Sequence, residues 1–166
     1  VNPSTGTSGG TLTLASGFYS GDSRLSTLNG GTLTSLYTEN NDCANYINNL
    51  ALMNGARVTG YKIRVGYHSA ASITVSGTSP CSLEAGLNMV NTSNRALPLT
   101  VADVTGSAAA DLSIPGVIRD YDTAGFAGMP IVKAGAGTVS LSGANTHVGP
   151  ITVTAGTLAL GATNTL

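Results

Sequence analysis

Charged residues are scarce in this 166-residue sequence. They make up 9% of the chain, against about a quarter of an average soluble domain. Gly, Ser, Thr, Asn and Ala take their place. Solvent-facing helices depend on Glu, Lys, Arg and Gln, whereas Thr and Ser on a pleated surface, with Gly and Asn at turns, are typical of β-structure. The composition therefore predicts an all-β chain, and a hydrophobic content of 42% excludes the disordered class.

Features that would indicate several ligand classes are also missing. The formal net charge is −1 and no run of Lys and Arg interrupts the neutral background, which excludes nucleic acid as a partner. No apolar run approaches the roughly 20 residues that a membrane-spanning helix needs. The sequence has no phosphate-binding glycine motif and no metal-ligand spacing, so we expect no cofactor and no metal ion.

Cysteine is nearly absent as well. Cys43 and Cys81 are too few for a disulfide framework or a zinc site. They either form one disulfide between neighbouring layers of the chain or remain separate thiols, and the sequence leaves both possibilities open.

A short phrase recurs near both ends of the chain. A glycine is followed by alternating polar and apolar residues at 10–14, 31–34, 137–141 and 156–160. Alternation with period two buries one face of a strand and leaves the other to solvent. Looser strand patterns occupy 56–60, 61–66, 72–77, 97–101, 111–114 and 150–153, and we also assign strand within 40–53.

The recurrence of similar units indicates stacked coils. It predicts a parallel β-helix of about seven rungs, forming a single domain over 1–166, with a β-sandwich or jelly roll as the alternative. The uncharged Thr, Ser and Asn on the outer face support stacking, because like charges in neighbouring rungs would repel each other.

The segment 131–161 reads IVKAGAGTVSLSGANTHVGPITVTAGTLALG. It closely resembles the passenger-associated transport repeat, or autotransporter-associated β-strand repeat, whose pattern is approximately K-x-G-x-G-T-L-x-L-S-G-x-N-T-Y-x-G-x-T-x-V-x-x-G-T-L-x-L-G. The departures are Val139 for Leu, His147 for Tyr, and Pro150 beside the corner glycine. Matching positions that we expect to be structural are Lys133, Gly135, Gly137, Leu141, Gly143, Asn145, Gly149, Val153, Gly156, Leu158 and Leu160.

The resemblance implies a right-handed, single-stranded parallel β-helix in a secreted protein or at the bacterial outer-membrane surface. Its implied function is a non-enzymatic scaffold or adhesin segment that supports display, secretion and adhesion, with a glycan or protein of a host or neighbouring cell as partner. Membrane contact would run only through a barrel that is absent from this chain. The alternative is a subunit of an extracellular filament that assembles by end-to-end stacking, since the last strand has no charged or proline guard.

Parallel β-helices also include polysaccharide lyases and hydrolases, so we searched for clustered acidic residues. The candidates for a calcium or sugar site are Asp111, Asp120 and Asp122, with Asp103 upstream. A solvated corner loop is the more common role of such residues. His68 and His147 are isolated, with a stacking role expected for His147, and we assign no catalytic residue.

The one concentrated basic and aromatic stretch surrounds residues 57–67. In a strand, Lys62 and Arg64 share one face, while Tyr61, Ile63 and Val65 share the other. This pattern predicts solvated charges above a core, and a ligand-contact face formed by Lys62 and Arg64 is the second interpretation.

Overall fold

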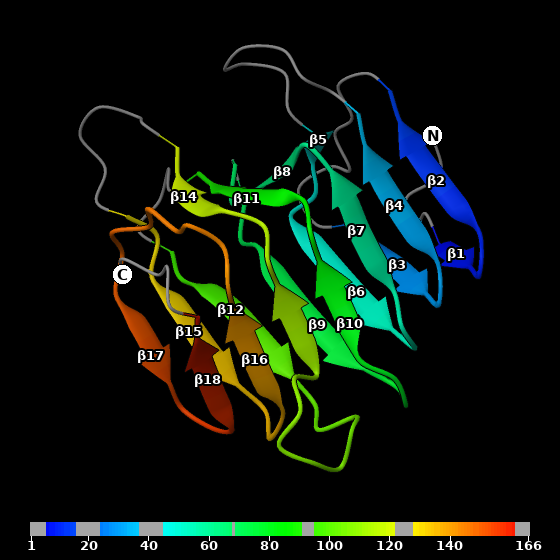
Figure 1. Ribbon diagram of the computed structural model, residues 1–166. Coiled ribbons are helices and arrows are strands. Elements are labelled where there is room, and N and C mark those ends of the chain that lie inside the picture. Colours follow the sequence, from blue (N-terminus) through cyan, green and yellow to red (C-terminus); the bar gives the residue numbers. More distant parts are fainter. Residues whose placement is uncertain are drawn as a thin grey trace.

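The chain winds through rungs of β-strand stacked in a column, seen from the side in Figure 1. The computed structural model describes residues 6–15, 24–36, 45–67, 69–90, 95–121 and 128–161. These residues form strands, turns and loops, and none of them forms a helix that would span a membrane.

Three sheets make up the sides of the column. The first contains β1 (Gly6–Ser8), β3 (Leu25–Asn29), β6 (Asn49–Met53), β9 (Ser72–Ser76), β12 (Leu97–Val101), β15 (Ile131–Ala134) and β17 (Ile151–Val153). The second contains β2 (Thr11–Leu14), β4 (Thr32–Ser35), β7 (Arg57–Gly60), β10 (Cys81–Leu83), β13 (Leu112–Ile114), β16 (Thr138–Leu141) and β18 (Thr157–Leu160). The third contains β5 (Asn45–Tyr46), β8 (Lys62–Val65), β11 (Gly86–Met89) and β14 (Ile118–Asp120).

Every strand pair among the described residues is parallel, and the strands of each sheet stack in chain order. The two larger sheets have seven strands each, which gives seven rungs. This confirms the parallel β-helix and excludes the sandwich, whose sheets are antiparallel. The strand assignment within 40–53 is confirmed at β5 and β6, while 40–44 lie outside the described residues.

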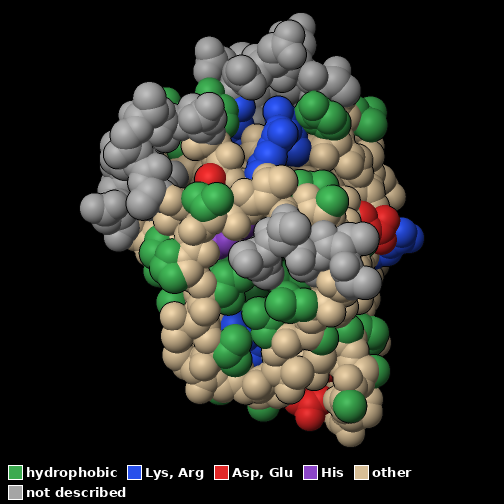
Figure 2. All heavy atoms as spheres, turned by 60° about the vertical axis from the view of Figure 1, so that its left-hand side comes forward, with side chains coloured by type: hydrophobic (Ala, Val, Ile, Leu, Met, Phe, Trp, Pro, Cys, Tyr) green, Lys and Arg blue, Asp and Glu red, His purple; other side chains and the backbone are tan. Residues whose placement is uncertain are grey.

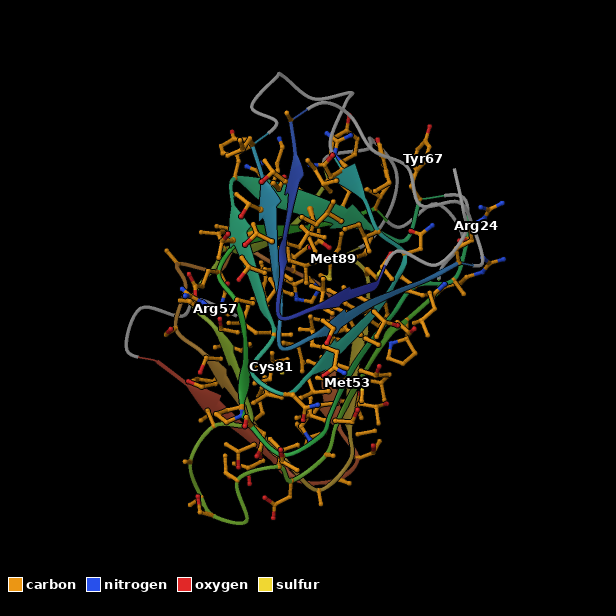
Figure 3. All side chains as sticks on the ribbon, turned by 90° about the vertical axis from the view of Figure 1, so that its right-hand side faces the viewer. Arg24, Met53, Arg57, Tyr67, Cys81 and Met89 are labelled. Carbon is orange, nitrogen blue, oxygen red and sulfur yellow. The ribbon has the colours of Figure 1, made fainter. Side chains whose placement is uncertain are left out.

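The alternation read from the sequence sets which side chains line the interior. Leu12 pairs with Leu33, Leu33 with Val58, and Val58 with Leu83, so that apolar side chains stack from rung to rung. Leu33, Val58 and Leu83 are at most 2% exposed. Because burying each such side chain contributes about 1.5–3 kcal/mol, this column is the main source of stability. Figure 3, a view along the stack, shows Met89 within the interior and Arg57 on the outside.

Stacked asparagines organise the corner between the first two sheets. Asn54 adopts a φ of 52°, and Gly55 after it has a φ of 79°. The Asn54 side-chain Nδ2 donates to Asn29 Oδ1 at 2.7 Å in the rung before. The Asn54 Oδ1 accepts from the backbone amide of Thr78 at 3.0 Å in the rung after. The Asn-Gly pairs therefore act both as turns and as links between rungs.

Other corners require glycine because neighbouring rungs approach closely. A Cβ on Gly137 would lie 2.3 Å from the Ala102 carbonyl oxygen of the preceding rung. Gly10 holds the same place in its own Gly-Thr-Leu phrase, yet a Cβ there would meet nothing within 4 Å.

This contrast gives a matched pair of substitutions. Gly137→Ala is expected to lower the free energy of unfolding by about 2–3 kcal/mol, because backbone must shift to admit the methyl group. Gly10→Ala should change it by less than about 0.5 kcal/mol. Urea denaturation followed by circular dichroism measures both, and equal effects would contradict the close stacking of rungs at Gly137.

Candidate functional site

The carboxylate of Asp111 holds backbone rather than facing a ligand. It precedes β13, is fully buried, and accepts hydrogen bonds from the amides of Val104 and Thr105, each at 2.8 Å. Its other oxygen accepts from the Thr138 amide at 2.7 Å, in the next rung. Burial alone would raise the pKa of Asp111, but these hydrogen bonds outweigh burial and lower it. Asp111 thus ties a loop to two rungs.

Asp120, at the end of β14, also accepts hydrogen bonds from backbone amides. Its oxygens accept from the amides of Met129 at 3.0 Å and Val148 at 2.8 Å. Asp103 accepts from the Gly106 amide at 2.7 Å within its own exposed loop. Because Asp111 opens a strand of the second sheet and Asp120 ends one of the third, the two carboxylates do not form a common site. Asp122 lies outside the described residues.

The oxygens of Asp111 and Asp120 accept hydrogen bonds from backbone amides, and the calcium or sugar site expected from these acidic residues stays a prediction. Within the described ranges, no three His, Cys, Asp or Glu side chains are grouped so as to hold a metal ion.

Lys133 lies in the interior of the sixth rung, on β15. Its side chain is completely buried and its Nζ donates to the carbonyls of Ala134 at 3.0 Å and Gly135 at 2.8 Å. A third bond, to Ala155 at 2.9 Å, reaches the seventh rung. Burial lowers the pKa of Lys133, while the negative charge of Asp111 opposes that shift. The ammonium thus fastens the last two described rungs at one corner.

Residues 143–148 continue the sixth rung beside β14. Asn145 is buried, and its Oδ1 accepts from the Ile118 amide at 2.7 Å. The Thr146 amide donates to the Ile118 carbonyl at 3.0 Å. His147 is buried too, and its Nε2 forms a hydrogen bond with the Met129 carbonyl at 2.7 Å. The Asn145 side chain thus forms a hydrogen bond to β14 of the kind that backbone carbonyls form between other neighbouring strands.

A family model, the passenger-associated-transport-repeat, matches residues 131–160, which span this lysine and this asparagine. The match is confined to these residues. No curated protein and no solved structure matches the chain. The repeat forms β15 to β18, and it is attached to the preceding rung through Asp111, Asp120 and Ile118.

Glycines of the repeat leave room for these polar groups. A Cβ on Gly156 would lie 2.7 Å from Lys133 Nζ, and one on Gly149 would lie 2.7 Å from His147 Nε2. A Cβ on Gly143 would lie 2.5 Å from the Gly116 carbonyl oxygen. Gly143 and Gly156 thus allow close contacts between rungs.

Lys62 and Arg64 lie on the outer face of β8, as the alternation predicts, but they are not solvated. Their exposed fractions are 6% and 1%, whereas Tyr61, assigned to the core face, is 50% exposed. The Arg64 guanidinium lies 5.4 Å from the ring centre of Tyr46 and 4.3 Å from that of Tyr121, and it donates to the Tyr46 hydroxyl at 2.6 Å. Aromatic rings from other rungs cover the charge, and Tyr61 sits at a corner before the strand begins.

Beside Lys62, the outer face of the third sheet is hollowed into an open pocket of about 380 Å³. Figure 2 shows Lys and Arg side chains gathered on this face. The lining residues are Tyr61, Lys62, Glu84, Gly86, Asn88, Pro115, Gly116, Val117 and Arg119. Glu84 and Asn88 could not be predicted from the sequence as neighbours of this pocket, because only the stacking of the rungs brings them to it.

Two positive side chains, Lys62 and Arg119, and one negative side chain, Glu84, line the pocket. Burial, followed by the positive charges of Arg119 and Arg64, lowers the pKa of Lys62. Hydrogen bonds from Arg57, and then Ser82, lower the pKa of Glu84, which binds Arg57 at 2.7 Å. The Glu84 carboxylate in the pocket wall is thus already paired with Arg57, and the positive charges of Lys62 and Arg119 remain in the candidate site.

Cys81 carries a free thiol and packs within the core at 3% exposure. Burial raises its pKa, which disfavours the reactive thiolate. The disulfide with Cys43 is not formed at Cys81, while Cys43 and His68 themselves lie outside the described residues.

Proposed function

We propose that this chain is a non-enzymatic scaffold segment of a secreted or cell-surface protein, which supports display, secretion and adhesion. The observation that carries the proposal is the passenger-associated-transport-repeat at 131–160, which forms the last two described rungs. A β-helix of this kind presents a long, regular surface on a rigid column.

The use of the acidic residues supports a non-enzymatic role. Asp111 and Asp120 bind backbone amides through both carboxylate oxygens, so neither is available for proton transfer to a sugar. Their removal would loosen the fold, as expected of structural groups.

Antibody labelling of intact producing cells tests the surface location. We expect antibodies against the purified chain to label cells without permeabilisation, and external protease to remove the signal. Labelling that requires permeabilisation would contradict the proposal. Incubation of the chain with polygalacturonate tests the non-enzymatic role. Release of reducing ends or unsaturated products would show that the chain is an enzyme and would contradict this part of the proposal.

A second candidate function is end-to-end self-association. In the seventh rung, Val153 and Leu160 are 45% and 55% exposed, although their register partners Lys133 and Leu141 are buried. A further rung of strands from another copy would cover these side chains. Sedimentation velocity over a range of concentrations should then show growing mass that Leu160→Lys abolishes. A constant mass of 16.5 kDa would remove this candidate.

A further inference from the structure

We propose that the pocket beside Tyr61 binds an acidic sugar, with Lys62 and Arg119 holding its carboxylate or sulfate group and Tyr61 contacting the ring. The biological use of this site rests on the proposed adhesive function, but the binding itself does not.

The pocket stands on rigid elements. Lys62 begins β8 and Arg119 lies in β14, with β11 paired between these two strands. Gly86 lies in register with Lys62, and its missing side chain leaves the outer face hollow. The Arg119 Nε donates to Asn88 Oδ1, which orients the guanidinium. Two cations are thus held in place by strands rather than by loops.

Both cations lack a negative counterpart among the described residues. The Arg57–Glu84 ion pair and the contact between His147 and Asp120 do not include Lys62 or Arg119. The Lys62 ammonium lies 5.0 Å from the ring centre of Tyr61 and makes no hydrogen bond that the described part of the chain shows. An anion in the pocket would supply the missing acceptor and relieve the repulsion between the two positive charges.

The aromatic and aliphatic parts of the wall favour a sugar as the group that carries the anion. Tyr61 and Val117 are 50% and 38% exposed, which offers an aromatic and aliphatic surface to the apolar face of a pyranose ring. The Glu84 carboxylate at the rim of the pocket provides acceptors for hydroxyl groups. A volume of about 380 Å³ is in the range of small-molecule pockets, and the weak overall charge is unsuited to nucleic acid.

Titration of the ¹⁵N-labelled chain with three disaccharides tests the proposal. Digalacturonate carries carboxylates, a chondroitin sulfate disaccharide adds sulfate, and galactobiose is the uncharged control. We expect an acidic disaccharide to shift the amide signals of Gly86, Val117 and Arg119, and to bind at least tenfold more tightly than galactobiose. The tighter of the two acidic sugars identifies the preferred group, and added salt should weaken its binding.

Substitutions locate the site. Arg119→Gln and Lys62→Gln are each expected to weaken binding at least tenfold, and Tyr61→Ala should weaken it too. Arg95→Gln removes an exposed cation outside the pocket and should change affinity less than twofold. Because Lys62 is buried, the amide spectrum of its variant must first show a native fold; Arg119 and Tyr61 are exposed and provide the test independently.

Three outcomes would overturn the proposal: no shift with either acidic disaccharide, equal binding of galactobiose, or unchanged affinity in Arg119→Gln. None of them would affect the antibody labelling of intact cells, so failure of the pocket and failure of the scaffold function are distinguishable.

Discussion

Replacing Asp111 by alanine is expected to lower the free energy of unfolding at pH 7 by about 3–5 kcal/mol. The substitution leaves three backbone amides without their acceptor, and each such loss costs about 1–3 kcal/mol. Urea denaturation followed by circular dichroism measures the change. Asp103→Ala is the matched control, because that carboxylate accepts one exposed amide of its own loop, and it should cost about 1 kcal/mol or less.

The same side chain predicts how stability varies with acid. The pKa of Asp111 in the folded chain is below the ordinary value of 3.8, so its carboxylate contributes stability above that pH. The contribution is lost as the pH falls through the folded pKa, because the unfolded chain binds the proton more readily. The difference between the parent chain and Asp111→Ala should therefore narrow below about pH 4. Glu84 also has a lowered pKa, but it is present in both proteins and cancels. A gap that stays constant from pH 7 down to pH 2 would contradict the role given to Asp111.

Lys133→Met is expected to cost about 3–4 kcal/mol of unfolding free energy at neutral pH. Methionine fills similar space, but three carbonyls lose their donor and the nearby Asp111 loses its opposing charge. Arg95→Met, on an exposed loop, should change stability by less than about 0.5 kcal/mol. Urea denaturation of both variants measures the effect. A loss below about 1 kcal/mol for Lys133→Met would show that its contacts do not fasten the last rungs.

The stacked strands could be predicted from the sequence because their signal is local. Leu12 and Leu33 each follow a glycine in a period-two pattern, and the repetition of that pattern indicates similar rungs. The Asn-Gly pair at Asn54 likewise indicates a turn through its own backbone preference. These features need no knowledge of the partner strand.

The polar interior and the pocket depend on partners far away in the chain. The residues next to Lys133 in the sequence do not indicate that its ammonium donates to the Ala155 carbonyl of another rung. Lys133 could be predicted as structural only from the resemblance of 131–161 to a known repeat. Lys62 and Arg64 were assigned to the correct face but with the wrong exposure, because rings of other rungs, such as Tyr46, cover that face. Asp111 was interpreted as a ligand-binding candidate because the sequence does not show which backbone amides a carboxylate will bind.

The two proposals are linked by the rigidity of the third sheet. Its strands hold Arg64, Asn88 and Arg119 in register on one outer face. The paired backbones of these strands therefore fix the shape of the pocket. A scaffold that presents such a face at a cell surface would offer a fixed cationic site to acidic sugars.

Nuclear Overhauser contacts between methyl groups test most directly whether the rungs stack in register. In a chain with labelled Leu and Val methyl groups, we expect cross-peaks joining Leu12 to Leu33, Leu33 to Val58, and Val58 to Leu83. Leu12 and Val58 are two rungs apart, roughly 10 Å, and should show none. The absence of the three cross-peaks, or backbone contacts that make these segments antiparallel, would contradict the β-helix.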